Sequence, residues 1–276
     1  MRIYALAVYL FLYIPIAVIA VFSFNAGRYA AQLQGFSTQW YGKALANPFV
    51  MEALQTSATV ALAAATLATL AGTMAALALQ GVTGRPRAVF DALLYIAVMV
   101  PGIVIGISTL IALVTVFDWL NPILAAIWPA GWTAPQLRLG KGSLIAAHGL
   151  FAMALVVIIV RARVAGMDRS LIEASADLGA TPWGTFRQVT LPQIFPAILA
   201  GFLLSFTFSF DDFIVAFFVA GSETTLPIYV FSSIRRGVTP EINAIGTMVL
   251  AASLLILVVA QSILQRGQRK GGGRAA

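Results

Sequence analysis

Long apolar stretches alternate with short polar segments along this chain of 276 residues. Six of the stretches are long enough to cross the hydrocarbon core of a bilayer, for which an α-helix needs about 17–25 mostly apolar residues. They cover about residues 3–24, 53–79, 89–117, 144–160, 194–220 and 242–264. The pattern therefore predicts an all-α, polytopic membrane protein with about six transmembrane helices, built as a single membrane domain over residues 1–276.

The amino-acid composition places the chain in lipid rather than in water. Hydrophobic residues make up 60% of the sequence and charged residues only 10%, whereas soluble domains carry about 25% charged residues. A soluble fold could not bury so much apolar surface. We therefore expect the lipid bilayer to surround most of this chain.

The lysine and arginine residues between the apolar stretches predict the orientation of the chain. If the N-terminus lies inside, the loops and termini on that side hold eleven of these residues, and those on the other side hold six. Segments rich in lysine and arginine stay on the cytoplasmic side of a membrane. We therefore expect both termini in the cytoplasm, with the basic, glycine-rich tail 265–276 disordered there.

Several kinds of chemistry are excluded by what the sequence lacks. Without cysteine there is no disulfide or thiolate metal site, and one histidine, His148, cannot build an imidazole cluster. We expect no metal or cofactor on this chain, and a structural role for His148 or a place near the outer interface. Residues 140–143 lack the full pattern of a phosphate-binding loop, so the chain should not hydrolyse ATP. No pair of nucleophile and base is evident, and we assign no catalytic residue.

One polar segment, residues 161–193, is too structured for a simple connection between membrane helices. Ser170 and Glu173 have the spacing of a capping box, which predicts a helix over residues 171–178. Gly179 suits the left-handed turn that often follows a helix.

A second short helix is predicted after this turn. Thr181 followed by Pro182 suits a helix start, and we expect the helix to run to about Val189 and to end at Pro192. The apolar residues of both helices also fit a connector that lies on the membrane surface. A helix-turn-helix unit tethered so close to the bilayer is a poor nucleic-acid reader, so we expect no nucleic-acid partner.

The loop over residues 168–192 carries a pattern known from transport proteins. Glu173-Ala174-Ser175 is followed by Gly179 and then by Val189-Thr190-Leu191-Pro192. This resembles the EAA signature of the permeases of type I ABC importers, with serine in place of the third alanine and valine in place of isoleucine. The resemblance implies that the loop docks on a separate ATPase subunit through Glu173, Ala174, Ser175, Gly179, Leu191 and Pro192.

Other segments resemble the PotC-type permeases of spermidine/putrescine importers in particular. They are Phe24-Asn25 with Arg28-Tyr29, Phe36-Ser37 to Trp40-Tyr41, and residues 209–213, 226–229 and 235–244. The resemblance implies a type I ABC importer permease fold in a bacterial inner membrane, and a role in polyamine import.

The same resemblance implies a set of partners. We expect a second, similar permease subunit, two ATPase subunits that hold the ATP and Mg²⁺, and a periplasmic substrate-binding protein. This chain would then be the non-catalytic membrane subunit of the complex.

Four polar residues in the fifth apolar stretch are candidates for the substrate path. Ser205, Ser209 and Asp212 share one helical face, whereas Asp211 points about 100° away. A carboxylate near the outer mouth would replace part of the hydration shell of a polyamine's ammonium groups. The alternative is a pair of interfacial aspartates that cap a helix or form ion pairs with arginine.

Two other functions fit parts of the same pattern. The same machinery serves other small solutes, such as aminoethylphosphonate, in similar permeases. An ion-coupled secondary transporter would need ionisable residues near the middle of the membrane and broken helices in paired halves. Neither feature is evident in the sequence.

Overall fold

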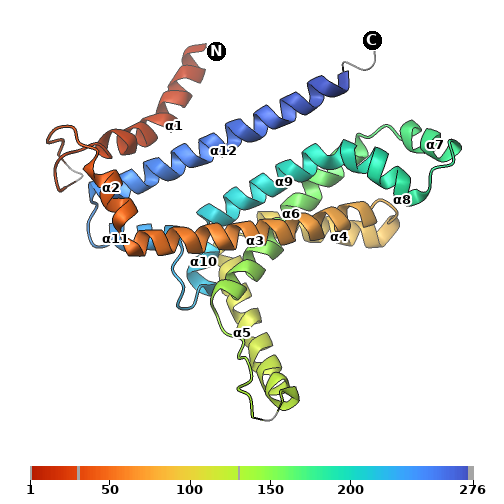
Figure 1. The fold of residues 1–276 in the computed structure, drawn as a ribbon, viewed down its shortest axis with the longest axis horizontal. Helices are drawn as coiled ribbons and strands as arrows, with labels where there is room; N and C mark the ends of the chain where they lie inside the picture. Colours follow the sequence, from red (N-terminus) through yellow and green to blue (C-terminus); the bar gives the residue numbers. More distant parts are fainter. Residues whose placement is uncertain (1, 30–31, 130, 273–276) are drawn as a thin grey trace. The chain divides into compact units, whose positions relative to one another are not determined.

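The computed structural model describes residues 2–29, 32–129 and 131–272 (Figure 1). The described residues form helices and connecting segments without a β-strand, which confirms the all-α prediction. In chain order the helices are α1 (Arg2–Phe22), α2 (Gln39–Ala46), α3 (Pro48–Ala78), α4 (Gly84–Met99), α5 (Gly102–Ile127), α6 (Lys141–Ala165), α7 (Ser170–Asp177), α8 (Pro182–Thr185), a π-helical turn (Phe186–Thr190), α9 (Leu191–Asp211), α10 (Ile214–Val219), α11 (Leu226–Ile234) and α12 (Pro240–Gly272).

Six helical segments among the described residues are long and apolar enough to cross a membrane. They are Tyr4–Phe22, Pro48–Ala78, Gly102–Ile127, Lys141–Ala165, Pro182–Asp211 and Pro240–Val258. The predicted number of about six spans is confirmed, although several of their boundaries differ.

The third apolar stretch forms two helices instead of one helix over residues 89–117. Helix α4 ends at Met99 and α5 begins at Gly102, with extended backbone at Val100 and Pro101 between them. Proline has no N–H to donate and disfavours helical backbone in the residue before it. Helix α5 then continues to Ile127, farther than the sequence suggests.

The fifth apolar stretch, predicted as one helix over residues 194–220, is also broken. Helix α9 ends at Asp211, and Asp212 is extended before α10 begins. The Asp212 Oδ2 accepts a hydrogen bond from the Ala216 N–H at 2.9 Å. This bond satisfies a donor at the start of α10 that has no partner within the helix, so it stabilises the break.

The prediction that Pro192 ends a helix is wrong. The chain stays helical from Pro182 to Asp211, through the π-helical turn in which the Leu191 N–H donates to the Phe186 carbonyl. The wider turn accommodates Pro192, which has no N–H and would clash with a carbonyl in a regular α-helix.

The prediction of a disordered tail over residues 265–276 is also wrong for its first part. Helix α12 continues to Gly272, and residues 273–276 lie outside the described residues. Glutamine, arginine and lysine are good helix formers, and positive charge is favourable near a helix C-terminus. The polar composition therefore ends the membrane span without ending the helix.

The chain divides into two compact units. One consists of Met1–Leu54 with Ile228–Ala276, and the other of Gln55–Pro227. The boundaries fall within α3 and near the start of α11.

In the Gln55–Pro227 unit, α6 packs closely against α9 and α3 (Figure 1). A Cβ added to Gly72 of α3 would lie 2.8 Å from the Val156 Cβ, and one added to Gly201 of α9 would lie 3.4 Å from Val156 side-chain atoms. Small residues at helix contacts let backbones approach in this way in membrane proteins. Val156 and Val160 of α6 are fully buried at this contact.

In the other unit, α1 and α2 both pack against α12.

A buried asparagine, Asn25, shapes the connection between α1 and α2. Its side chain donates to the carbonyls of Tyr29 and Gln32 and accepts from the Gln34 N–H at 2.8 Å. The Trp40 indole donates to the Asn25 carbonyl at 2.8 Å.

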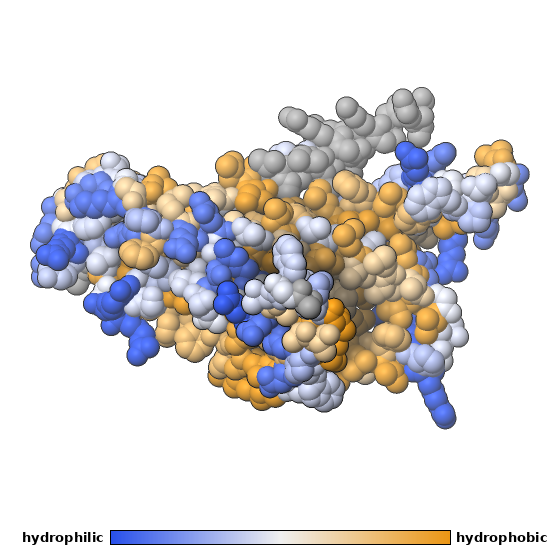
Figure 2. All heavy atoms as spheres, turned by 60° about the horizontal axis from the view of Figure 1, so that its bottom comes forward, coloured by the Kyte–Doolittle hydropathy of each residue, from blue (hydrophilic) through white to orange (hydrophobic). Residues whose placement is uncertain are grey.

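Apolar side chains cover much of the visible surface (Figure 2). Helix α1 illustrates this, because Tyr4, Phe11 and Tyr13 are 78%, 80% and 61% exposed. Such exposure is expected of helices whose surroundings are lipid.

Candidate functional site

Three of the four candidate path residues lie where α9 meets α6 and α10. Ser205 and Ser209 of α9 are buried, and Asp212 is partly buried in the link to α10. Asp211 is exposed and does not line the cavity described below. Ser205 also lies outside the cavity wall, and its hydroxyl has no hydrogen-bond partner among the described residues.

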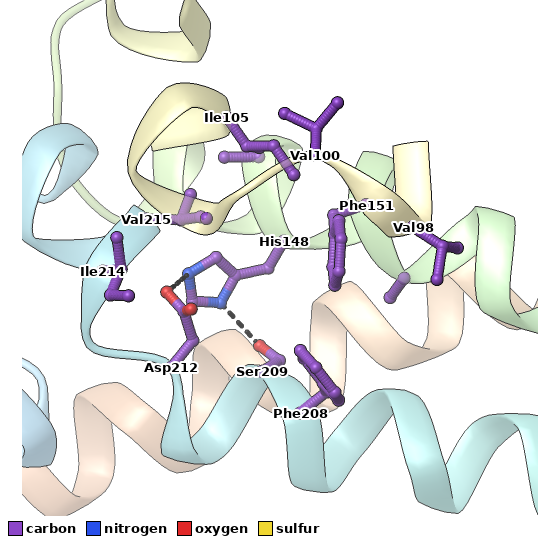
Figure 3. Close-up of a pocket in the computed structure, with 13 residues that line it drawn as sticks. Val98, Val100, Ile105, His148, Phe151, Phe208, Ser209, Asp212, Ile214 and Val215 are labelled. Carbon is purple, nitrogen blue, oxygen red and sulfur yellow. Dashed lines mark hydrogen bonds and ion pairs between the residues drawn. The ribbon is translucent and has the colours of Figure 1, made fainter. Parts of the chain in front are cut away.

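His148 of α6 joins two of these residues (Figure 3). Its Nδ1 lies 2.7 Å from the Ser209 Oγ, and its Nε2 lies 3.4 Å from the Asp212 Oδ2. The His148 side chain is only 3% exposed. The sequence predicts a structural role for His148 or a place near the outer interface, and it does not predict these contacts. The available signal was a single histidine within an apolar helix.

The hydrogen-bonding roles follow from the acceptor-only carboxylate. An ionised Asp212 can only accept, so the proton of a neutral imidazole belongs on Nε2. Nδ1 is then an acceptor, and the Ser209 hydroxyl donates to it. Ser209 is thus hydrogen-bonded to His148, while the His148 Nε2 makes no hydrogen bond among the described residues and faces the Asp212 carboxylate at 3.4 Å, an ion-pair distance.

A serine, a histidine and an aspartate in contact also occur in hydrolases. The sequence alone reveals no nucleophile and base, because Ser209 and His148 are far apart along the chain. Their contact is a feature that only the structure brings out. A polar chain of this kind can also serve to orient a carboxylate, which requires no chemical step.

A cavity of about 290 Å³ lies beside the three residues. His148, Ser209 and Asp212 are its polar side chains, and the rest of the wall is mostly apolar, with Val98, Val100, Ile105, Phe151, Phe208 and Ile214 (Figure 3). Both helix breaks contribute to this wall, through Val100 and Asp212. Irregular backbone at membrane depth is tolerated where it lines a cavity or is buried in protein.

The chemistry of the cavity suits a cation with an aliphatic body. A carboxylate attracts an ammonium group, and valine, isoleucine and phenylalanine side chains accept methylene groups. Phe151 and Phe208, with ring centroids 5.4 Å apart, add two aromatic rings to the wall, and aromatic faces attract cations. Among the described residues, no three His, Cys, Asp or Glu side chains lie close enough to hold a metal ion.

The 168–192 loop forms a second candidate site. Figure 1 shows α7 and α8 beyond the N-terminal end of α9. Glu173 and Ala174 are exposed on α7, whereas Ser175 is partly buried and its Oγ lies 2.9 Å from the Thr185 Oγ1. This bond ties α7 to α8.

The predicted capping box of Ser170 and Glu173 is wrong. The Ser170 N–H donates instead to the Asp168 Oδ1 at 2.9 Å, and Arg169 stands at the N-cap without a side-chain bond. Hydrogen bonds from the Ser170 side chain and backbone hold the pKa of Asp168 below its usual range. Asp168 is therefore the acidic residue that stabilises the start of α7.

The turn between the two short helices has the predicted form. Gly179 has a φ of +78°, in the left-handed region, and the Thr181 side chain accepts from the Gly184 N–H at 3.2 Å. Leu191 and Pro192 lie at the start of α9, in a continuous helix with the preceding π-helical turn.

Large apolar side chains stand out from this loop. Leu171, Leu178 and Trp183 are 48%, 89% and 69% exposed, and Trp183 stacks on Phe186 with ring centroids 5.4 Å apart. An exposed apolar group next to Glu173 forms a surface that another protein could cover.

A known family model covers most of the chain. The model described as "Binding-protein-dependent transport system inner membrane component" matches residues 68–270. The chain is also similar to named transport proteins along nearly its whole length. It is 36% identical to the spermidine/putrescine transport system permease protein PotC of Shigella flexneri over 97% of this chain and 94% of that protein. It is 38% identical to the putrescine transport system permease protein PotI of Escherichia coli (strain K12) over 94% of this chain and 89% of that protein.

Solved structures share the fold. A bacterial ABC transporter involved in the import of the acidic polysaccharide alginate matches with a TM-score of 0.72 and 14% identity, over 96% of this chain and 95% of the matched chain. A bacterial alginate ABC transporter in complex with an alginate pentasaccharide-bound periplasmic protein matches with a TM-score of 0.70 and 16% identity, over 96% of this chain and 93% of the matched chain. At these identities the likeness concerns the fold alone.

Proposed function

Because this chain belongs to the family of binding-protein-dependent transport system inner membrane components, we propose that it is the permease subunit of an ATP-driven importer of polyamines. The observation that carries the proposal is the similarity, over nearly the whole chain, to permeases named for spermidine and putrescine. The cavity beside Asp212 supports it, because its wall combines one carboxylate with apolar side chains.

The energy for transport comes from separate subunits in this proposal. Two ATPase subunits hold ATP and Mg²⁺, and a second, similar permease completes the membrane core. A periplasmic substrate-binding protein delivers the polyamine. The alginate transporter, which has this fold, was solved in complex with a periplasmic protein, and this supports a partner of that kind.

The 168–192 loop is the contact for the ATPase. Its exposed Leu178 and Trp183 supply apolar area, and Glu173 supplies charge. The bond between Ser175 and Thr185 ties α7 to α8. The chain is helical from α8 to the end of α9 without a break. A displacement of the loop by the ATPase is therefore transmitted to the helix that carries Ser209 and is followed by Asp212.

The chain lies in a bacterial inner membrane, with both termini and the 168–192 loop in the cytoplasm. The excess of lysine and arginine on that side supports this orientation. The Asp212 cavity then belongs to the outer half of the membrane, because His148 comes early in α6, which returns toward the cytoplasm.

Asp212 is the residue in the substrate path that selects for positive charge. A polyamine places an ammonium group against its carboxylate and methylene groups against the apolar wall. An anionic phosphonate group would be repelled there, so the cavity favours polyamines over aminoethylphosphonate.

Uptake by vesicles that contain the whole reconstituted complex tests this function. We expect ATP-dependent uptake of labelled spermidine or putrescine, and none of labelled aminoethylphosphonate. Uptake of the phosphonate without uptake of either polyamine would contradict the polyamine assignment. Purification of the chain from its native membrane without an associated ATPase would contradict the importer assignment.

A further inference from the structure

The Asp212 carboxylate is held by one oxygen. Oδ2 accepts from the Ala216 N–H at 2.9 Å and faces the His148 Nε2 at 3.4 Å. Among the described residues, Oδ1 makes no hydrogen bond with the protein. One oxygen is therefore fixed while the other is available to a ligand.

Asp212 needs an external support to keep this orientation. It lies in extended backbone between α9 and α10, outside the regular hydrogen bonding of either helix. The bond to Ala216 links it only to its own local segment. His148 is the contact that comes from another helix, α6, and it also contacts Ser209 one helical turn earlier on α9.

No other charged group lines the described wall of the cavity. Helices α4 and α5 contribute apolar side chains and Gly102, while α10 contributes Ile214 and Val215. Lys141, which forms an ion pair with Glu223 at 3.7 Å, lies seven residues before His148. This separation corresponds to about 10 Å along α6. Asp211, next to Asp212 in the chain, is exposed and lies outside the cavity wall. His148 and Asp212 are thus the only ionisable side chains among the described residues that line the cavity.

Contact between neighbouring helices does not by itself explain a histidine at position 148. Helices α6 and α9 already meet through Val156 and Gly201. The Ser143 Oγ of α6 donates to the Val219 carbonyl of α10 at 2.7 Å, which ties these two helices together. A buried imidazole costs free energy unless it is hydrogen-bonded, and an apolar residue would pack as well.

We infer that His148 is a positioning residue for substrate transfer: its imidazole, anchored by Ser209, holds Asp212 so that the second carboxylate oxygen receives an ammonium group of the substrate. This inference rests on the proposed function. It adds a residue that does not bind the substrate itself. His148 instead determines how well the Asp212 carboxylate binds the ammonium group.

Two amide substitutions separate the two contacts of the imidazole. In number of bonds from Cα, the side-chain nitrogen of glutamine corresponds to Nε2, and the side-chain oxygen of asparagine, which can accept from Ser209, corresponds to Nδ1. His148→Gln therefore keeps a donor for Asp212, whereas His148→Asn keeps only the contact to Ser209. His148→Met keeps bulk and loses both contacts. Ser143→Ala is the matched control, because it removes another buried polar contact of α6 outside the cavity.

The measurement is polyamine uptake per assembled complex, together with ATP hydrolysis stimulated by the loaded binding protein, in the same vesicles. We expect His148→Asn and His148→Met to lower uptake per ATP about threefold to tenfold, since both remove the polar group that faces the Asp212 carboxylate at 3.4 Å. His148→Gln should stay within about twofold of wild type, since its amide N–H can face the Asp212 carboxylate in the same place. Ser143→Ala should lower the amount or thermal stability of the complex and leave uptake per ATP unchanged.

A double substitution tests whether His148 acts through Asp212. If it does, His148→Met adds little to Asp212→Asn, because coupled residues are not additive. Three outcomes would overturn the inference while leaving the proposed function intact. The effects of His148→Met and Asp212→Asn on uptake could be fully additive, His148→Met could leave the ratio of uptake to ATP hydrolysis unchanged, or His148→Gln and His148→Asn could lower that ratio equally. Absence of polyamine uptake by the wild-type complex would instead contradict the proposed function, and this inference with it.

Discussion

At the scale of single residues, Asp212 combines a helix-capping hydrogen bond with a charged carboxylate that faces the cavity. Its Oδ2 caps α10 through Ala216, and its side chain is 20% exposed at the cavity. An amide oxygen can make the same cap. The structural and electrostatic roles of this residue can therefore be separated by one substitution.

Asp212→Asn should lower polyamine uptake per complex by about tenfold or more, because a neutral amide loses the charge that strengthens the bond to an ammonium group. The amount of assembled complex should not change. Asp118→Asn is the control, since Asp118 is an exposed carboxylate of α5 outside the cavity. Unchanged uptake kinetics in Asp212→Asn would remove Asp212 from the substrate path.

Asp168 gives a second prediction at this scale. Its pKa in the folded chain is lowered by bonds from Ser170, so its contribution to α7 is complete above the usual carboxyl pKa and is lost as pH falls through the lowered one. At neutral pH, Asp168→Ala should speed hydrogen exchange of the α7 amides. Asp168→Asn should change it much less, because asparagine also caps helices. Equal exchange in Asp168→Ala and wild type would show that this residue does not stabilise α7.

Helical periodicity is enough to place Ser209 and Asp212 on one face, because that relation is local. It cannot reveal which helix faces them, so the contact with His148 emerges only from the packing of α6 on α9. The cap of α7 shows a different limit. Ser170 and Asp168 are both good acceptors near the same helix start, and a shift of two residues decides between them.

At the scale of helices, close approach depends on glycine at particular contacts. Gly72→Ala should destabilise the protein by about 1–3 kcal/mol, since its Cβ would meet the Val156 Cβ at 2.8 Å and the Met153 carbonyl at 3.0 Å. The melting temperature in detergent measures this. Gly142→Ala in α6 meets no atom within 4 Å, so its melting temperature should be equal to or above that of wild type. A normal melting temperature for Gly72→Ala would contradict the tight contact of α3 and α6.

The sequence predicts the number of membrane helices well, because length and hydropathy define a span. It does not show the breaks at Pro101 and Asp212, which lie within continuous apolar runs. A proline breaks one helix here, and at Pro192 a π-helical turn accommodates another. Local sequence alone does not decide between these two outcomes.

At the scale of the whole molecule, orientation is the first property to test. The chain contains no cysteine, so a single introduced thiol reports its own side of the membrane. Tyr29 and Leu178 are 69% and 89% exposed. In intact cells with a permeable outer membrane, an impermeant thiol reagent should label Tyr29→Cys and not Leu178→Cys. The reverse pattern would contradict cytoplasmic termini.

The central claim is that ATP drives polyamine transport through this chain by way of the 168–192 loop. Gly179 is decisive for the loop, because its φ of +78° strains any β-branched residue while no atom lies within 4 Å of the added Cβ. Gly179→Val should therefore disturb the turn without a clash elsewhere, and Gly179→Asn should tolerate it.

The most direct measurement is spermidine uptake and ATP hydrolysis in the same vesicles, made with the wild-type and Gly179→Val complexes. We predict ATP-dependent uptake by the wild-type complex, and loss of both uptake and polyamine-stimulated hydrolysis in Gly179→Val, with recovery in Gly179→Asn. Spermidine uptake that continues without ATP, or that is unaffected by Gly179→Val, would contradict the account.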